Sequence, residues 1–97
     1  MQFTEKTEEY IPMLTVYSVS WCPHCKKMIR YLTDNHIDFI YRDIEHQPGD
    51  VVQKVIKANG GRDWVVPTLE YKGEWIPGRS FDESSVHEDL KKWDLIQ

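Results

Sequence analysis

MLTVYSVSWCPHCKKMIRYLTDN, residues 13–35, is the stretch that decides the fold. Its first six residues are mostly of apolar and β-favouring types, which predicts a strand buried on both faces. Beyond this strand, apolar side chains recur at helical spacing, Pro23 suits the first position of a helix, and Asn35 suits its end. Strand and helix meet at Cys22. We therefore expect Cys22 at the start of the helix and Cys25 one turn inside it.

The middle of the chain repeats this order of strand and helix. IDFIYRDI, residues 37–44, predicts a second strand, and EHQPGD after it predicts a turn. DVVQKVIKAN, residues 50–59, carries branched apolar side chains at helical spacing. The two glycines that follow predict the end of a second helix.

The last third of the chain predicts a hairpin and a final helix. WVVPTLEY, residues 64–71, indicates a strand that contains a proline. KG at 72–73 indicates a hairpin turn, and EWIP after it indicates a short partner strand. Ser80-x-x-Glu83 has the pattern of a reciprocal helix cap, and apolar residues at turn spacing follow it.

These elements predict the order βαβαββα. A parallel crossover followed by an antiparallel hairpin gives an α/β protein with a four-stranded mixed sheet flanked by helices, which is a thioredoxin-like fold. We expect one such domain over residues 13–97, preceded by a polar lead-in at residues 1–12, because 97 residues suffice for a single core.

Composition and charge narrow the possible partners. The chain has 12 basic and 16 acidic residues, a net charge of -4, and this argues against nucleic acid as a partner because no positive field would attract phosphates. No apolar run approaches the roughly 20 residues that cross a membrane, and the first residues lack the pattern of a signal peptide. We therefore expect a cytoplasmic monomer. In a reducing compartment, its two cysteines favour metal or redox chemistry over a permanent cross-link.

The spacing of the two cysteines is compatible with a structural disulfide, a metal site or a redox site. A disulfide that closes four residues restrains the unfolded chain by only about 2 kcal/mol and is easily reduced. A structural zinc site needs four ligands, whereas His36, His46 and His87 are scattered and form no second paired motif. We therefore predict a redox-active pair and no bound metal.

The two cysteines are expected to have different roles. Free amides at the start of the helix and the helix dipole favour a thiolate at Cys22, the predicted nucleophile. His24, Lys26 and Lys27 are expected to add positive charge beside it. Cys25 is shielded inside the helix and is the predicted resolving thiol.

Substrate binding is predicted around Pro67. If the Val66-Pro67 bond is cis, as in thioredoxin-like folds, the backbone of Val66 is exposed beside Cys22 and can pair with an extended substrate. Trp21 and Trp64 would then form an apolar rim, although aromatic residues that only cover a core edge, the role we assign to Trp75 and Trp93, would show the same pattern. The candidate substrate-binding residues are Trp21, Pro23, His24, Trp64, Val66 and Pro67.

Several motifs together resemble those of a known family. TVYSVSWCPHC at 15–25, DIE at 43–45, NGG at 59–61 and VPT at 66–68 resemble the glutaredoxin family, and they look most like its mycoredoxin branch. The resemblance covers nearly the whole chain. It implies reduction of protein disulfides, or of mixed disulfides between a protein and a small thiol, with Cys22 as the nucleophile. It also implies no bound cofactor, with a low-molecular-weight thiol such as glutathione or a mycothiol-like molecule as co-substrate.

Several positions differ from the usual pattern of that family, among them Val65, Pro77, Ser80 and Phe81. Val19 stands where many glutaredoxins carry a lysine that holds a glutathione carboxylate. His24 replaces the usual tyrosine, and a histidine there is expected to stabilise the thiolate and so to favour the reduced form. Groups nearby that could replace missing glutathione contacts are Arg62, Arg79 and Asp82.

Two other functions remain compatible with the sequence. A dedicated electron donor for one reductive enzyme would be recycled by a thioredoxin-reductase-type enzyme and would ignore small mixed disulfides. A non-enzymatic module would instead bind zinc or an iron-sulfur cluster, although Pro23 disfavours the cluster because cluster-binding relatives usually have glycine at this position.

Overall fold

The computed structural model describes residues 12–97, so most of the predicted lead-in lies outside the described part of the chain. The elements follow the predicted order. They are β1 (Leu14–Ser18), α1 (Pro23–Asp34), β2 (Phe39–Asp43), the short 3₁₀ helix η2 (Ile44–His46), α2 (Gly49–Ala58), β3 (Thr68–Tyr71), β4 (Glu74–Ile76) and α3 (Glu83–Lys92). Within residues 12–97, no helix has the length and apolar character needed to span a membrane.

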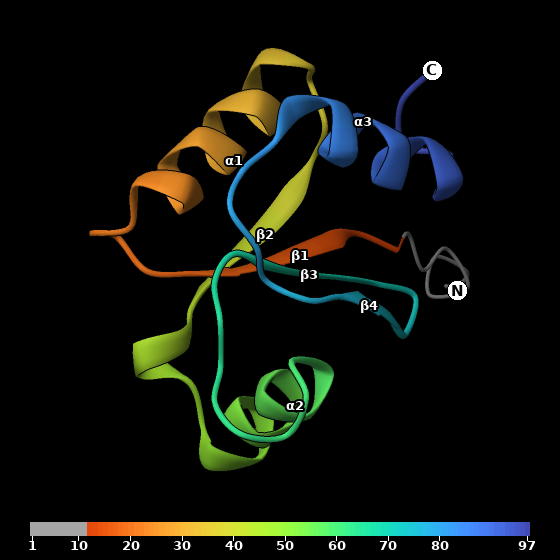
Figure 1. The fold of residues 1–97 in the computed structure, drawn as a ribbon. Coiled ribbons are helices and arrows are strands. Elements are labelled where there is room, and N and C mark those ends of the chain that lie inside the picture. The colour runs from red at the N-terminus through yellow and green to blue at the C-terminus, as the bar shows by residue number, and fades with distance from the viewer. Residues whose placement is uncertain (1–11) are drawn as a thin grey trace, which may run out of the picture.

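The four strands form one mixed sheet in the order β2-β1-β3-β4 (Figure 1). β1 pairs in parallel with β2 and antiparallel with β3, and β3 pairs antiparallel with β4. Lys72 and Gly73 form the turn of the last hairpin, with φ angles of 52° and 83°. Positive φ at both central residues is the geometry that twists two strands correctly into a tight hairpin. The predicted α/β class and thioredoxin-like arrangement are confirmed.

Helices cover both faces of this sheet, α1 and α3 on one and α2 on the other (Figure 1). The core under α1 and α3 consists of Leu14, Val16, Met28, Leu32, Ile37, Leu69, Val86 and Leu90. The second core, which we call the α2-side core, consists of Tyr17, Val19, Cys22, Cys25, Ile44 and Val55. Both cysteines therefore belong to a packed cluster rather than to a loose surface loop.

The third strand is shorter than predicted. We expected a strand from residue 64, but β3 begins at Thr68. Pro67 has no N–H to donate to a neighbouring strand, so the ladder can start only after it. Residues 64–67 are left outside the sheet as a connecting segment before β3.

The predicted cap of the last helix is wrong. α3 begins at Glu83, and its N-cap is Asp82 rather than Ser80. The Asp82 carboxylate accepts the backbone N–H of Ser85 at 3.0 Å and its hydroxyl at 2.7 Å. Phe81 packs against the core under α1 and α3, and its own N–H is bonded to a side chain of α1. That anchoring holds the chain before Asp82 outside the helix.

Candidate active site

Cys22 lies where β1 passes into α1. It is the N-cap of α1, with extended backbone angles (φ -91°, ψ 122°), and its C=O accepts the N–H of Lys26 at 3.1 Å. Pro23 is the first residue of the helix, a position at which the missing N–H costs nothing. The Cys22 side chain makes no capping hydrogen bond, so the first-turn amides are left for the sulfur of a reaction partner or for a thiolate to use, which stays a prediction. Cys22 keeps 9% of its surface exposed.

Cys25 is more deeply enclosed, with 1% of its surface exposed. Both cysteines are reduced in this structure. Burial raises the pKa of the Cys25 thiol, the Ser18 hydroxyl and the Val19 backbone lower it, and a hydrogen bond to Cys22 and the charge of Cys22 raise it further. Cys25 therefore holds its proton and can donate it toward the Cys22 sulfur.

Ser18 is a residue that the sequence analysis missed. It ends β1 and is 1% exposed. Its Oγ is buried and makes no hydrogen bond of normal geometry with any described residue, yet the hydroxyl lies close enough to Cys25 to lower the pKa of that thiol. A serine at the end of a mostly apolar strand, four residues before Cys22, was the signal available in the sequence.

The segment before β3 forms the second part of the site. The Val66-Pro67 bond is cis, as expected. Trp64 and Val66 are half-buried and pack against the α2-side core, which contains both cysteines. Pro67 is buried. The structure thus brings residues 64–67 to the cysteine pair across about 40 residues of sequence.

The tryptophans divide into two groups. Trp21 is 63% exposed beside Cys22, and its Nε1 donates to Glu45 Oε1 of η2 at 3.4 Å. Trp75 instead stacks on Tyr17 with a ring-centroid distance of 5.7 Å, and Trp93 packs against the core under α1 and α3. The core-edge assignment of Trp75 and Trp93 is confirmed, and Trp21 is left as an exposed aromatic surface next to Cys22.

His24 differs from expectation. Its Nδ1 accepts the backbone N–H of Phe81 at 3.0 Å. A ring nitrogen that accepts a hydrogen bond carries no proton, so the remaining proton of the neutral ring is on Nε2. This hydrogen bond is a contact that the sequence analysis did not predict. It fastens the first turn of α1 to the segment that leads into α3.

Asn59 supports the segment before β3. Its side-chain Nδ2 donates to Thr68 Oγ1 at 3.0 Å, and its Oδ1 accepts the N–H of Gly78 at 2.8 Å. Gly78 lies so close to Val65 that a Cβ on it would come within 2.7 Å of the Val65 backbone. Only glycine fits this contact, which holds the chain after β4 against the residue next to Val66.

Some of the residues that could replace the missing glutathione contacts already bind other side chains or backbone groups of the protein. Arg79 forms an ion pair with Asp89, and Asp82 caps α3. Val19 is fully buried, whereas Arg62 is exposed. In the part of the chain that the structure describes, no group of three or more His, Cys, Asp and Glu side chains is arranged to hold a metal ion.

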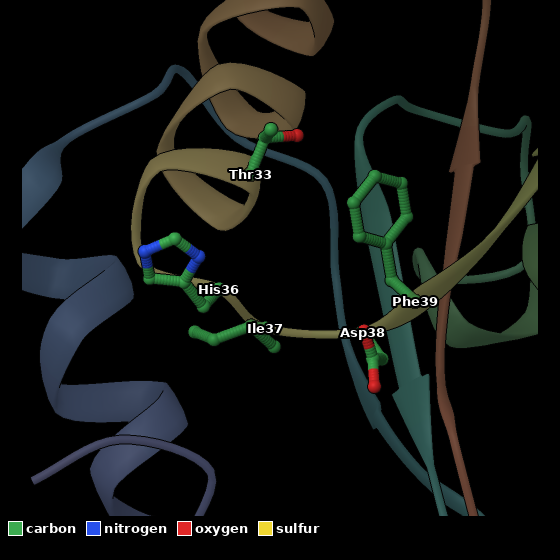
Figure 2. A pocket seen from close by; sticks show the side chains of 5 residues that line it. All are labelled: Thr33, His36, Ile37, Asp38 and Phe39. Atoms are coloured by element: carbon green, nitrogen blue, oxygen red, sulfur yellow. The ribbon is translucent and has the colours of Figure 1, made fainter.

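A separate pocket lies at the opposite end of α1. It has a volume of about 370 Å³ and is lined by Thr33, His36, Ile37, Asp38 and Phe39. Figure 2 shows these side chains around the connection from α1 to β2. None of them carries a thiol, and α1 separates them from the cysteine pair at its first turn, so we place this pocket outside the candidate active site.

Comparisons with known sequences agree with the motifs. Residues 14–76 match the family model for glutaredoxin. Mycoredoxin 1 of Corynebacterium glutamicum is 31% identical over 58 residues, which cover 60% of this chain and 68% of the relative. A glutaredoxin-type protein of Mycobacterium tuberculosis is 37% identical over 71 residues, which cover 72% of this chain and 82% of the relative.

Solved structures show the same architecture. A glutaredoxin from Methanosarcina mazei superposes with a TM-score of 0.66 and 29% identity, over 80% of this chain and 77% of that one. A glutaredoxin from Archaeoglobus fulgidus superposes with a TM-score of 0.63 over 89% of this chain and 94% of that one. Its 23% identity supports the shared fold alone.

Proposed function

The chain belongs to the glutaredoxin family of thiol-disulfide oxidoreductases, and from this premise we propose that it reduces protein or mixed disulfides with Cys22 as the nucleophile and Cys25 as the resolving thiol. The difference between the two cysteines carries the assignment of roles. Cys22 is at the helix start with the larger exposed fraction, whereas burial encloses Cys25 and raises the pKa of its thiol.

The reaction proceeds in two exchange steps. The Cys22 thiolate forms a bond to one sulfur of the substrate disulfide, the substrate S–S bond breaks, and the other sulfur leaves as a thiolate that takes a proton from water. Cys25 then loses its proton and attacks Cys22 Sγ. A Cys22–Cys25 disulfide forms, the second substrate thiol leaves, and two electrons have passed from the protein to the substrate.

The surroundings of Cys22 suit a disulfide carried on an extended segment. The backbone of Val66 next to Pro67 would pair with the main chain of a protein substrate. Trp21 and Trp64 would contact apolar side chains of the substrate, and Pro23 would line the approach to the sulfur, whereas His24 is held by its bond to the Phe81 N–H. Trp21 supports this placement best, because a large exposed aromatic side chain adjoins the nucleophile.

Return to the dithiol state requires two electrons from outside the protein. We assign this role to a low-molecular-weight thiol, glutathione or a mycothiol-like molecule, with no bound cofactor. Arg62 is the candidate contact for a carboxylate of that thiol, since Arg79 and Asp82 already have partners.

Two serine substitutions test the roles of the cysteines. Cys22→Ser should reduce exchange with a mixed disulfide to background. Cys25→Ser should retain the first step and accumulate the mixed disulfide on Cys22, which mass spectrometry of the intact protein detects. Activity in Cys22→Ser, or loss of the first step in Cys25→Ser, would show that the roles are assigned wrongly.

Turnover assays with different reductants distinguish the proposed function from the two rival functions. Turnover should occur with glutathione or mycothiol. Turnover only with a thioredoxin-reductase-type enzyme would instead identify a dedicated electron donor, and zinc or iron in the purified protein without exchange activity would identify a metal-binding module.

A further inference from the structure

A second opening reaches Cys25 from between α1 and β2. It has a volume of about 310 Å³. Ser18 and Cys25, each 1% exposed, form its inner end. Its remaining lining residues are Val19, Ser20, Lys26, Ile29, Arg30 and Tyr41. The resolving thiol therefore has its own route to solvent, on a different side from residues 64–67.

The resolving step depends on the ionisation of Cys25. Cys25 must become a thiolate before it can attack, and its burial opposes that ionisation. The Ser18 hydroxyl and the Val19 backbone are the neutral donors beside Cys25, and among the described residues the hydroxyl has no competing hydrogen-bond partner of normal geometry. Buried hydroxyls normally have a partner, so a side chain left without one in the resting state is suited to gain it in another state.

We propose that the Ser18 hydroxyl donates a hydrogen bond to Cys25 Sγ as this sulfur ionises for the resolving step, and that the proton of Cys25 leaves to solvent through the opening between α1 and β2. The Cys25–Cys22 S–S bond then forms, the bond between Cys22 and the substrate sulfur breaks, and the substrate leaves as a thiolate. This inference rests on the proposed dithiol function and adds Ser18 to it.

The proposal predicts that removal of the Ser18 hydroxyl changes the rate of the resolving step, and that the direction of this change depends on pH. Without the hydroxyl, a smaller fraction of Cys25 is ionised, but the remaining thiolate is more nucleophilic, with a Brønsted coefficient of about 0.4–0.5. Near neutral pH the lost fraction dominates, and the resolving step should slow by about three- to tenfold. Above the titration of Cys25 only the gain in nucleophilicity remains, so the variant should be as fast as the unsubstituted protein or faster.

Other charged and titratable groups face Cys25, and they are the same in every variant. Cys22, Lys26 and Arg30 come from α1 or its cap, and Tyr41 comes from β2. A comparison of variants over the same pH range therefore isolates the contribution of Ser18.

Stopped-flow reaction with an aryl disulfide that releases a coloured thiolate resolves the two steps. The first release reports attack by Cys22, and the second reports attack by Cys25 on the mixed disulfide. Ser18→Ala should slow only the second phase at neutral pH. Ser20→Ala, which alters another hydroxyl of the same opening, is the matched control and should leave both phases unchanged.

Ser18→Thr and Ser18→Val form a second test, since the two side chains have similar shapes and differ in the hydroxyl. The Thr variant should resolve faster than the Val variant at neutral pH and lose this advantage above the titration of Cys25. A second phase that Ser18→Ala leaves unchanged, or slows equally at every pH, would overturn the role of Ser18 alone. If the unsubstituted protein shows no second phase, the dithiol function itself is wrong.

Discussion

At the scale of single residues, neighbouring side chains at the first turn of α1 have different contacts and different exposure, and the site depends on this difference. Cys22 caps α1 and is partly exposed, His24 turns away to bond the N–H of Phe81, and Cys25 is enclosed in the α2-side core. A helix rotates successive side chains by about 100°, so His24 points to another side than Cys25, whereas Cys22 and Cys25, three positions apart, stay close together in the same cluster. In the proposed function, the CPHC motif thereby supplies a nucleophile, an anchor and a resolving thiol.

His24 is therefore predicted to act on stability rather than through charge. His24→Leu leaves the Phe81 N–H without its acceptor and should lower the free energy of unfolding by about 1–2 kcal/mol, measured by urea denaturation. His24→Asn can place a carbonyl oxygen near the position of Nδ1 and should recover part of that loss. Attack by Cys22 should change little in either variant. A slower first phase with unchanged stability would instead support a charged histidine beside the sulfur.

At the scale of elements, the sequence predicted types and order well but could not choose between overlapping helix starts. Ser80-x-x-Glu83 and Asp82-x-x-Ser85 both fit the local pattern of an N-cap. The choice is made by Phe81, whose packing and backbone bond to His24 hold it outside α3. That bond joins residues 57 positions apart, and no local pattern contains such information.

The two candidate caps can be compared directly. Asp82→Ala should lower the melting temperature by roughly 4–8 °C at neutral pH, as expected for the loss of a helix N-cap, whereas Ser80→Ala should have little effect. Equal effects of the two substitutions would contradict the position of the helix start.

The effect of Asp82 should also depend on pH. Hydrogen bonds from the Ser85 hydroxyl, the Ser85 backbone and the Ser84 hydroxyl hold the pKa of Asp82 below its ordinary value of 3.8. Because the folded-state pKa is the lower one, the stabilisation is complete above the unfolded-state value and is lost as pH falls through the folded-state value. The difference between the unsubstituted protein and Asp82→Ala should therefore shrink below about pH 4.

At the scale of the whole molecule, the topology was predictable because each strand and helix carries its own sequence pattern. The long-range polar contacts were not predictable. Asn59 illustrates the limit. In the sequence it looks like the end of α2, which it is, but its side chain also reaches Thr68 at the start of β3 and Gly78 after β4. Both contacts lie beside residues 64–67, so one amide joins three segments around the substrate side of the site.

Asn59→Ala should therefore affect both stability and catalysis. The substitution removes the acceptor of the Gly78 N–H and the donor to the Thr68 hydroxyl, which keeps only its own bond to the Val65 C=O, and should lower the free energy of unfolding by about 2 kcal/mol, measured by urea denaturation. Asn35→Ala is the matched control, because Asn35 also caps a helix and donates to a carbonyl four residues back, at 2.8 Å, but its side chain is exposed and its bond is local. This control should lose less than about 1 kcal/mol. Attack by Cys22 on a protein disulfide should slow only in the Asn59 variant, since the chain at Gly78 supports Val65 and with it residues 64–67, the proposed substrate contact. Equal losses of stability in the two variants would mean that Asn59 acts only as a helix cap, and the placement of residues 64–67 would then need another source.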